Sequence, residues 1–179
     1  MKKAMSAAIC AIMMILAAAG FAACAGQPAE TPAEPPETPV LEEFQVSLYF
    51  VNEEYVVTGD ESLERLMPPE TAVIEAEPGT GPRAALEALK TVPDKEGYGT
   101  MILQEITFND VYIDGDTAYV DLSAENLNGS STQEGFLISQ IVKTLKGSFA
   151  DVAQVQFLVD GEIVESLMGH IDASKPFAE

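Results

Sequence analysis

Basic side chains are scarce in this chain of 179 residues. Lys and Arg number 9 against 29 Asp and Glu, so the formal net charge is −20. There is one histidine, there are two cysteines, and tryptophan is missing. Because no cluster of Lys or Arg could neutralise phosphates, a nucleic-acid partner is excluded. The scarcity of His and Cys leaves no spacing typical of a metal site, and we expect neither a metal nor another cofactor.

Residues suited to catalysis are equally sparse. His170 lies near the C-terminus in a glycine-flanked segment, and a general base needs a positioned nucleophile and an orienting partner, neither of which the sequence indicates. Ser130 and Ser131 are not part of a Gly-x-Ser-x-Gly turn, and a helix cap explains them. We therefore predict that the protein is not an enzyme and has no catalytic residue.

Carboxylates, by contrast, are abundant. Glycoside hydrolysis uses a pair of them, but with this many Glu residues no specific pair stands out. One polar cluster falls in an expected hairpin and could in principle bind calcium; it comprises Asn109, Asp110, Asp114, Asp116 and Asp121. The cluster lacks the spacing of an EF-hand, and a turn accounts for Asp114 and Gly115, so we favour a structural interpretation.

The N-terminus combines a basic start with an apolar run. Lys2 and Lys3 precede the apolar residues 4–20, which end in Phe21-Ala22-Ala23-Cys24. This arrangement resembles a bacterial lipoprotein signal peptide, with Phe21 where Leu is usual. It predicts cleavage between Ala23 and Cys24, lipidation of Cys24, and attachment at the extracytoplasmic face of the cell membrane. The alternative is an uncleaved membrane helix, since the run approaches the ~20 residues that span a bilayer.

Three regions follow from this interpretation. We expect a signal peptide at residues 1–23, a lipidated cysteine and tether at 24–43, and one folded domain at 44–179. The tether is rich in Pro and Glu, which favours extended polyproline II with a reach on the order of 60 Å. Cleavage would leave 7 basic and 29 acidic residues, a net charge of −22. A surface of that charge favours a neutral or basic partner.

Within the folded region, hydrophobic periodicity and turn signals predict strands and helices in alternation. Strands are expected at 44–51, 55–58, 71–75, 103–113 and 117–122, and helices at 82–91 and from Ser131 to about 146, the latter with a capping box formed by Ser131 and Glu134. A closing hairpin is expected from 152–159 and 163–167 around Asp160-Gly161. The hairpins require antiparallel pairing, so the predicted class is α+β: a single domain with a twisted, largely antiparallel sheet and two main helices on one face.

Several short motifs follow one another in a recognisable order and spacing. They are Leu48-Tyr49-Phe50, the helix motif Ala84-Ala85-Leu86-Glu87-Ala88-Leu89, Ala118-Tyr119-Val120-Asp121-Leu122-Ser123, the hairpin Val155 to Gly161, and the tail Gly169 to Pro176. Together they make the region similar to the GerMN domain of bacterial sporulation and spore germination lipoproteins. One stretch departs from the family pattern, because Thr91-Val92-Pro93 is followed by Gly97-Tyr98-Gly99-Thr100.

The resemblance implies a fold like the ring-building motifs of channel assemblies in the cell envelope. It also implies a non-catalytic role in envelope assembly, in sporulation or germination, with an envelope protein or peptidoglycan as partner besides the membrane. Two alternatives remain: a cell-wall hydrolase, and a module that binds peptidoglycan or a small ligand. A hydrolase should have a cleft with a buried carboxyl group of raised pKa.

Overall fold

Seven short strands and three helices make up residues 40–178, the part of the chain that the computed structural model describes. In chain order they are β1 (Glu42–Leu48), β2 (Val51–Asn52), α2 (Glu53–Thr58), β3 (Glu70–Ala76), α3 (Gly81–Ala88), β4 (Tyr98–Gly99), β5 (Phe108–Asp114), β6 (Thr117–Leu122), α4 (Ser131–Ser148) and β7 (Gln154–Val159). The α+β class is confirmed. The expected signal peptide, Cys24 and most of the tether lie outside the described residues.

The strands divide among three small sheets instead of joining one. β1 pairs with β3 and β2 with β4, both antiparallel, while β5, β6 and β7 form a three-stranded sheet in that order. β5 and β6 are the expected central hairpin, although β5 begins at Phe108 and not at Leu103. The strands expected at 71–75 and 117–122 are confirmed.

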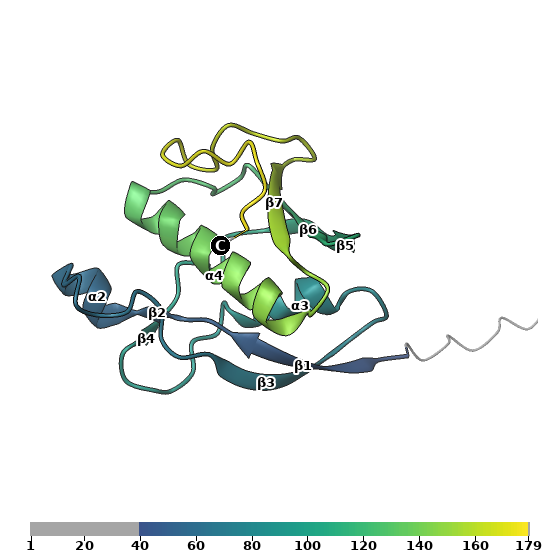
Figure 1. Ribbon diagram of the computed structural model, residues 1–179, viewed down its shortest axis with the longest axis horizontal. Coiled ribbons are helices and arrows are strands. Elements are labelled where there is room, and N and C mark those ends of the chain that lie inside the picture. Colours follow the sequence, from purple (N-terminus) through teal and green to yellow (C-terminus); the bar gives the residue numbers. More distant parts are fainter. Residues whose placement is uncertain (1–39, 179) are drawn as a thin grey trace, which may run out of the picture. The chain divides into compact units, whose positions relative to one another are not determined.

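Helix α4 is the central element of the core. Its buried apolar side chains are Phe136, Leu137, Ile138, Ile141, Val142 and Leu145. Figure 1 shows α4 passing between the β1–β3 ribbon and β7, with α3 beside it. The β1–β3 ribbon, β7 and α3 pack against this one helix, and the apolar burial supplies the main stabilising free energy of the fold.

Helix α4 also takes the place of a strand along the free edge of β1. The backbone N–H of Ser47 donates to Ser148 Oγ at 2.9 Å, and the N–H of Tyr49 donates to Thr144 Oγ1 at 3.1 Å. The side-chain amide of Gln140 donates to the Tyr49 carbonyl at 3.1 Å. These groups satisfy the C-terminal end of that edge at Ser47 and Tyr49, so a further strand could not pair there.

The strand expected at 55–58 is wrong, because these residues form helix α2. The Asn52 side chain accepts the backbone N–H of Glu54 at 3.1 Å and of Tyr55 at 3.4 Å, and two acidic residues occupy the first turn. An Asn cap and carboxylates at a helix N-terminus both favour the helix. In this short segment they outweigh the strand preference of Val56 and Val57.

The expected closing hairpin is also wrong. The Asp160-Gly161 turn forms, with φ of 49° and 82°, but it supports only one bridge, between Val159 and Glu162. β7 instead lies parallel to β6 and has a second bridge on its far side to Phe177. Residues 163–167 cannot continue a hairpin because the segment that follows donates its backbone N–H groups to a side chain of α4, as described below.

The cap of α4 differs from the expected one by a single residue. The N-cap is Ser130, whose side chain accepts the N–H of Gln133 at 3.3 Å, while Gln133 Oε1 accepts the N–H of Ser130 at 3.0 Å. The capping box is therefore Ser130 with Gln133, not Ser131 with Glu134. Glu134 is therefore not a capping residue. Its side chain lies in the protein interior, where it is fully buried.

Candidate functional site

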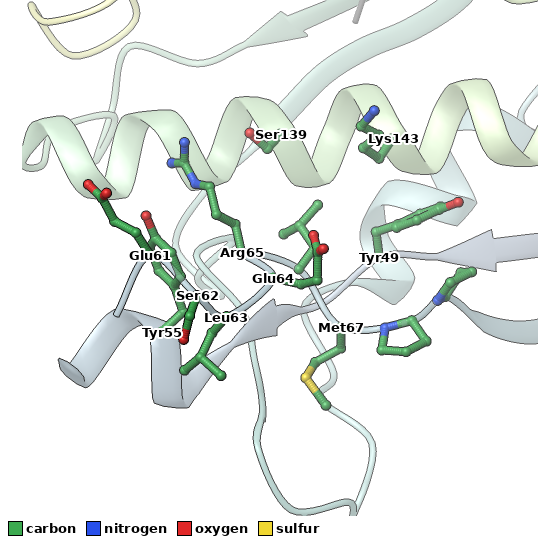
Figure 2. Close-up of a pocket in the computed structure, with 13 residues that line it drawn as sticks. Tyr49, Tyr55, Glu61, Ser62, Leu63, Glu64, Arg65, Met67, Ser139 and Lys143 are labelled. Atoms are coloured by element: carbon green, nitrogen blue, oxygen red, sulfur yellow. The ribbon is translucent and has the colours of Figure 1, made fainter. Parts of the chain in front are cut away.

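An open groove of about 760 Å³ runs between α4 and the segment 61–69. Figure 2 shows α4 as one wall, with the side chain of Arg65 reaching toward it from the segment 61–69. The residues that line it are Tyr49, Tyr55, Glu61, Ser62, Leu63, Glu64, Arg65, Leu66, Met67, Pro68, Pro69, Ser139 and Lys143. A volume of this size is typical of a small-ligand site.

The helical wall of the groove is built by residues spaced four apart. Ser139 and Lys143 line the groove, and Gly135 and Gly147 continue the same face at either end. The Ser139 hydroxyl donates to the Gly135 carbonyl at 2.7 Å, so it is engaged within the helix. At the other end, a Cβ on Gly147 would lie 3.0 Å from the Tyr49 ring, so the missing side chain makes room for that ring.

The opposite wall is held in place by β2. The N–H of Asn52 donates to the Arg65 carbonyl at 3.0 Å, and the Asn52 side chain donates to the Glu64 carbonyl at 2.9 Å. Leu66 forms an isolated bridge with Val51. These bonds fix the backbone of the wall, although the segment has no regular secondary structure of its own at 63–65.

Arg65 is the most constrained charged residue of the groove. Its guanidinium lies 4.8 Å from the Phe136 ring centroid and 5.8 Å from that of Tyr55, and the two rings meet edge to face at 5.9 Å. Cation–π stacking of this kind orients the guanidinium without using its N–H donors. No hydrogen bond from the Arg65 side chain occurs within residues 40–178, so the donors remain available to a ligand.

The charged residues of the groove are not paired with one another. Within residues 40–178 the two ion pairs are Glu87 with Lys90 at 2.8 Å and Glu70 with Lys95 at 2.5 Å. Lys95 and Tyr98 donate to Glu70 and hold the pKa of its carboxyl below the ordinary value. Both ion pairs lie away from the groove, so its two cations and two carboxylates face solvent without a protein partner.

The structure separates the site residues that the sequence suggested. Ser130 caps α4, and a ring nitrogen of His170 lies 3.1 Å from the Gly129 carbonyl. Ser131 follows the cap as the first residue of the helix. None of the three lines the groove.

The polar residues of the central hairpin do not converge. The strand register places Asp110 beside Asp121, with Asp114 at the turn end of β5. Asp121 accepts the N–H of Gly161 at 2.9 Å, and the Asn109 side chain donates to Asp160 at 3.2 Å. Asp116 accepts the hydroxyl of Thr117. Over residues 40–178, no group of three or more His, Cys, Asp or Glu could hold a metal ion.

Glu134 was predicted to be part of the capping box, but its carboxylate instead binds the segment that follows β7. Its carboxylate accepts the backbone N–H groups of Leu167, Met168 and His170 and the hydroxyl of Ser166, all at 2.8–3.0 Å. Burial by itself raises the pKa of Glu134, but these hydrogen bonds outweigh it and hold the pKa below its ordinary value. The sequence carried a signal, because Glu134 lies on the same helical stripe as Ile138, Ile141 and Leu145.

Other proteins share this fold. A protein from Clostridium perfringens that bears the name "Putative Lipoprotein" is 24% identical, with a TM-score of 0.52 over 76% of this chain and 88% of that one. The first GerMN domain of the sporulation protein GerM from Bacillus subtilis is 17% identical, with a TM-score of 0.57 over 75% of this chain and 97% of that one. The tandem GerMN domains of GerM give 18% identity and a TM-score of 0.50 over 84% of this chain and 48% of theirs.

No curated protein matches the chain. None of the helices within residues 40–178 is both long enough and apolar enough to cross a membrane. The family model named Germane and described as "Sporulation and spore germination" matches residues 47–165, which include every element from β2 to β7 and both walls of the groove. The predicted resemblance to GerMN domains is confirmed, and the chain belongs to the Germane family of sporulation and spore germination domains.

Proposed function

We propose that this protein is a lipid-anchored component of the cell envelope whose Germane domain is a non-catalytic binding module, with the α4 groove as its binding site. The observation that carries the proposal is the groove itself. Its charged residues face solvent and have no ion-pair partners in the described chain, which suits them to bind rather than to react. The similarity to a protein named as a lipoprotein supports the anchor.

The chemistry of the groove supports binding rather than turnover. The Ser139 hydroxyl is bonded within its own helix, and His170 lies outside the groove, so neither supplies a nucleophile with an adjacent base there. Glu61 and Glu64 are exposed, whereas the general acid of a glycosidase is a carboxyl group of raised pKa. Glu134, the buried carboxyl group of the described chain, has a lowered pKa and lies on other donors.

A cell-wall hydrolase is the alternative that the groove must be tested against, because Glu61, Glu64, Tyr49 and Tyr55 all line it. Purified protein incubated with peptidoglycan is expected to release no muropeptides. Release that is abolished by Glu61→Gln or Glu64→Gln would overturn the proposal. Glu105→Gln is a suitable control, since Glu105 is exposed and does not line the groove.

The anchor is tested separately at Cys24, which lies outside the described residues. Mass spectrometry of the protein purified from membranes should show an N-terminal cysteine with added acyl mass. Cys24→Ala should leave an unprocessed, longer precursor. An intact Met1 without acyl mass on the wild-type protein would show that the chain is not processed as proposed.

Binding is tested by cross-linking in intact cell envelopes. The wild-type protein should capture a partner that a groove variant captures less well, and high salt should weaken the association because the groove contacts are charged. If the wild-type protein cross-links nothing in the envelope, the binding-module proposal is wrong.

A further inference from the structure

The charges in the groove alternate in sign. Glu61, Arg65, Glu64 and Lys143 all line the groove, and Figure 2 shows their charged ends following one another in that order along α4. Two cations and two carboxylates make the groove neutral as a whole. This contrasts with a folded region whose other residues are strongly acidic.

The spacing of the groove cations is set by rigid elements. Arg65 is fixed at one end of the groove by its stacking on Phe136 and Tyr55. The guanidinium lies beside Gly135 of α4, because a Cβ built on Gly135 would lie 3.5 Å from Arg65 Nη2, an ordinary contact distance. Lys143 projects from the same helical face two turns further on, and helical side chains lean toward the N-terminus, here toward Ser139 and Arg65. The separation of the two cations therefore depends on how the segment 61–69 packs beside α4.

The carboxylates of Glu61 and Glu64 give the groove a second specificity. An anionic ligand would meet Arg65 and Lys143 favourably but would be repelled by Glu61 and Glu64. A cationic ligand would meet the reverse arrangement. A ligand that carries both charges can pair with the cations and with the carboxylates, and only such a ligand satisfies all four groups.

We propose that the groove binds short peptides that carry both free amino and free carboxylate groups, with Arg65 and Lys143 contacting the carboxylates and Glu61 and Glu64 contacting the amino groups. The exposed parts of Tyr49 and Met67 supply apolar contact between the charges. The volume of about 760 Å³ lies within the range of small-ligand pockets, which suits a short peptide. This inference rests on the proposed binding function and names its ligand as the peptide portion of the cell wall.

The first probe is the tetrapeptide Ala-Glu-Lys-Ala with free termini, titrated into the purified full-length protein by calorimetry. Arg65→Met and Lys143→Met should each weaken binding roughly three- to tenfold, the range expected for loss of one exposed to partly buried charge pair. Lys175→Met is the matched control, because it removes the same charge from an exposed residue outside the groove. Thermal melts of each variant separate a lost contact from a lost fold.

Chemically blocked peptides test whether Arg65 contacts the ligand carboxylates and whether Glu64 contacts the ligand amino groups. A peptide without carboxylates, Ala-Gln-Lys-Ala amide, should bind Arg65→Met and wild type alike. A peptide without amines, acetyl-Ala-Glu-Gln-Ala, should be insensitive to Glu64→Gln. Arg65→Lys should restore binding only in part, because lysine keeps the charge but not the planar stacking. The proposal is overturned if the free tetrapeptide does not bind, or if the groove variants bind within twofold of Lys175→Met.

The source of the peptide is tested with muropeptides released from peptidoglycan by a muramidase. They should compete with the tetrapeptide for the wild-type protein, and failure to compete would overturn the assignment to the cell wall. The outcome is distinguishable from failure of the binding function. Envelope cross-linking that depends on the groove, in a protein that does not bind the tetrapeptide, contradicts the peptide assignment alone, whereas absence of cross-linking in the wild type contradicts the binding function.

Discussion

Glu134 Oε2 on helix α4 accepts the backbone N–H of His170 at 2.9 Å, and this bond joins the middle of the core to the segment that follows β7. The same carboxylate holds Leu167 and Met168. This fully buried carboxylate accepts four hydrogen bonds, and it thereby satisfies backbone N–H groups of a segment that has no regular secondary structure. This arrangement gives the sharpest predictions for stability.

Glu134→Gln should destabilise the domain by roughly 2–5 kcal/mol. In the wild type, backbone N–H groups donate to both carboxylate oxygens of Glu134. In the variant an amide NH₂ replaces one of these oxygens, so two donors would face each other and a backbone N–H would lose its acceptor. Chemical denaturation measures the change in unfolding free energy. Glu125→Gln is the control, since Glu125 is exposed, and it should change the unfolding free energy by less than about 0.5 kcal/mol.

The same carboxylate predicts how stability depends on pH. Folding lowers the pKa of Glu134 below its ordinary value of 4.5, so the folded state favours the charged form. That contribution is complete at neutral pH and is lost as the pH falls through the folded-state value. Unfolding free energy measured from pH 7 downward should therefore decline below about pH 4.5, and more steeply in the wild type than in Glu134→Gln. Equal acid limbs in the two proteins would contradict the prediction.

The capping box gives a comparison between adjacent serines. Ser130→Ala should cost about 1 kcal/mol because it removes the acceptor of the Gln133 N–H. Ser131→Ala should cost much less, since Ser131 lies in the first turn and its side chain makes no capping bond. Urea denaturation of both variants decides between the two serines, and a larger loss in Ser131→Ala would place the cap where the sequence analysis had it.

The apolar stripe of α4 should dominate the stability of the fold. Ile141 and Leu145 are fully buried, so either substitution by Ala should cost roughly 2–5 kcal/mol through lost apolar burial and the cavity left behind. Both losses should exceed that of Ser130→Ala in the same denaturation series. If the cap variant proved the less stable, α4 would not be the centre of the core.

Gln140 links three separate segments through its side-chain amide. It donates to the Tyr49 carbonyl at 3.1 Å and accepts the Met101 N–H at 2.8 Å. Gln140→Leu should leave both backbone groups without a partner at a cost of about 2–4 kcal/mol. Gln45→Leu on the exposed face of β1 serves as the control and should be near neutral. Hydrogen exchange at Met101 should rise in Gln140→Leu and not in the control.

Local patterns in the sequence were sufficient for the elements whose partners are close in the chain. The central hairpin was predicted because its turn residues and alternating strands lie within one short stretch, and helix α4 was predicted because helical periodicity is a local property. The family was recognised from the order of such motifs. The signal-peptide pattern that ends at Cys24 is also local. Cleavage and lipidation at Cys24 stay a prediction, because Cys24 lies outside the described residues.

Tertiary structure alone decided the features that depend on distant residues. The sequence predicted a strand at residues 163–167. In the structure the backbone N–H groups of Leu167 and His170 donate to the Glu134 carboxylate, and Glu134 lies about thirty residues earlier in the chain. The groove could not be predicted for the same reason, since Tyr49, Arg65 and Lys143 have no common periodicity and line one groove only when α4 packs beside β1 and the segment 61–69. Composition fixed the acidic character of the chain, whereas packing collected two of its few cations beside two carboxylates in one place.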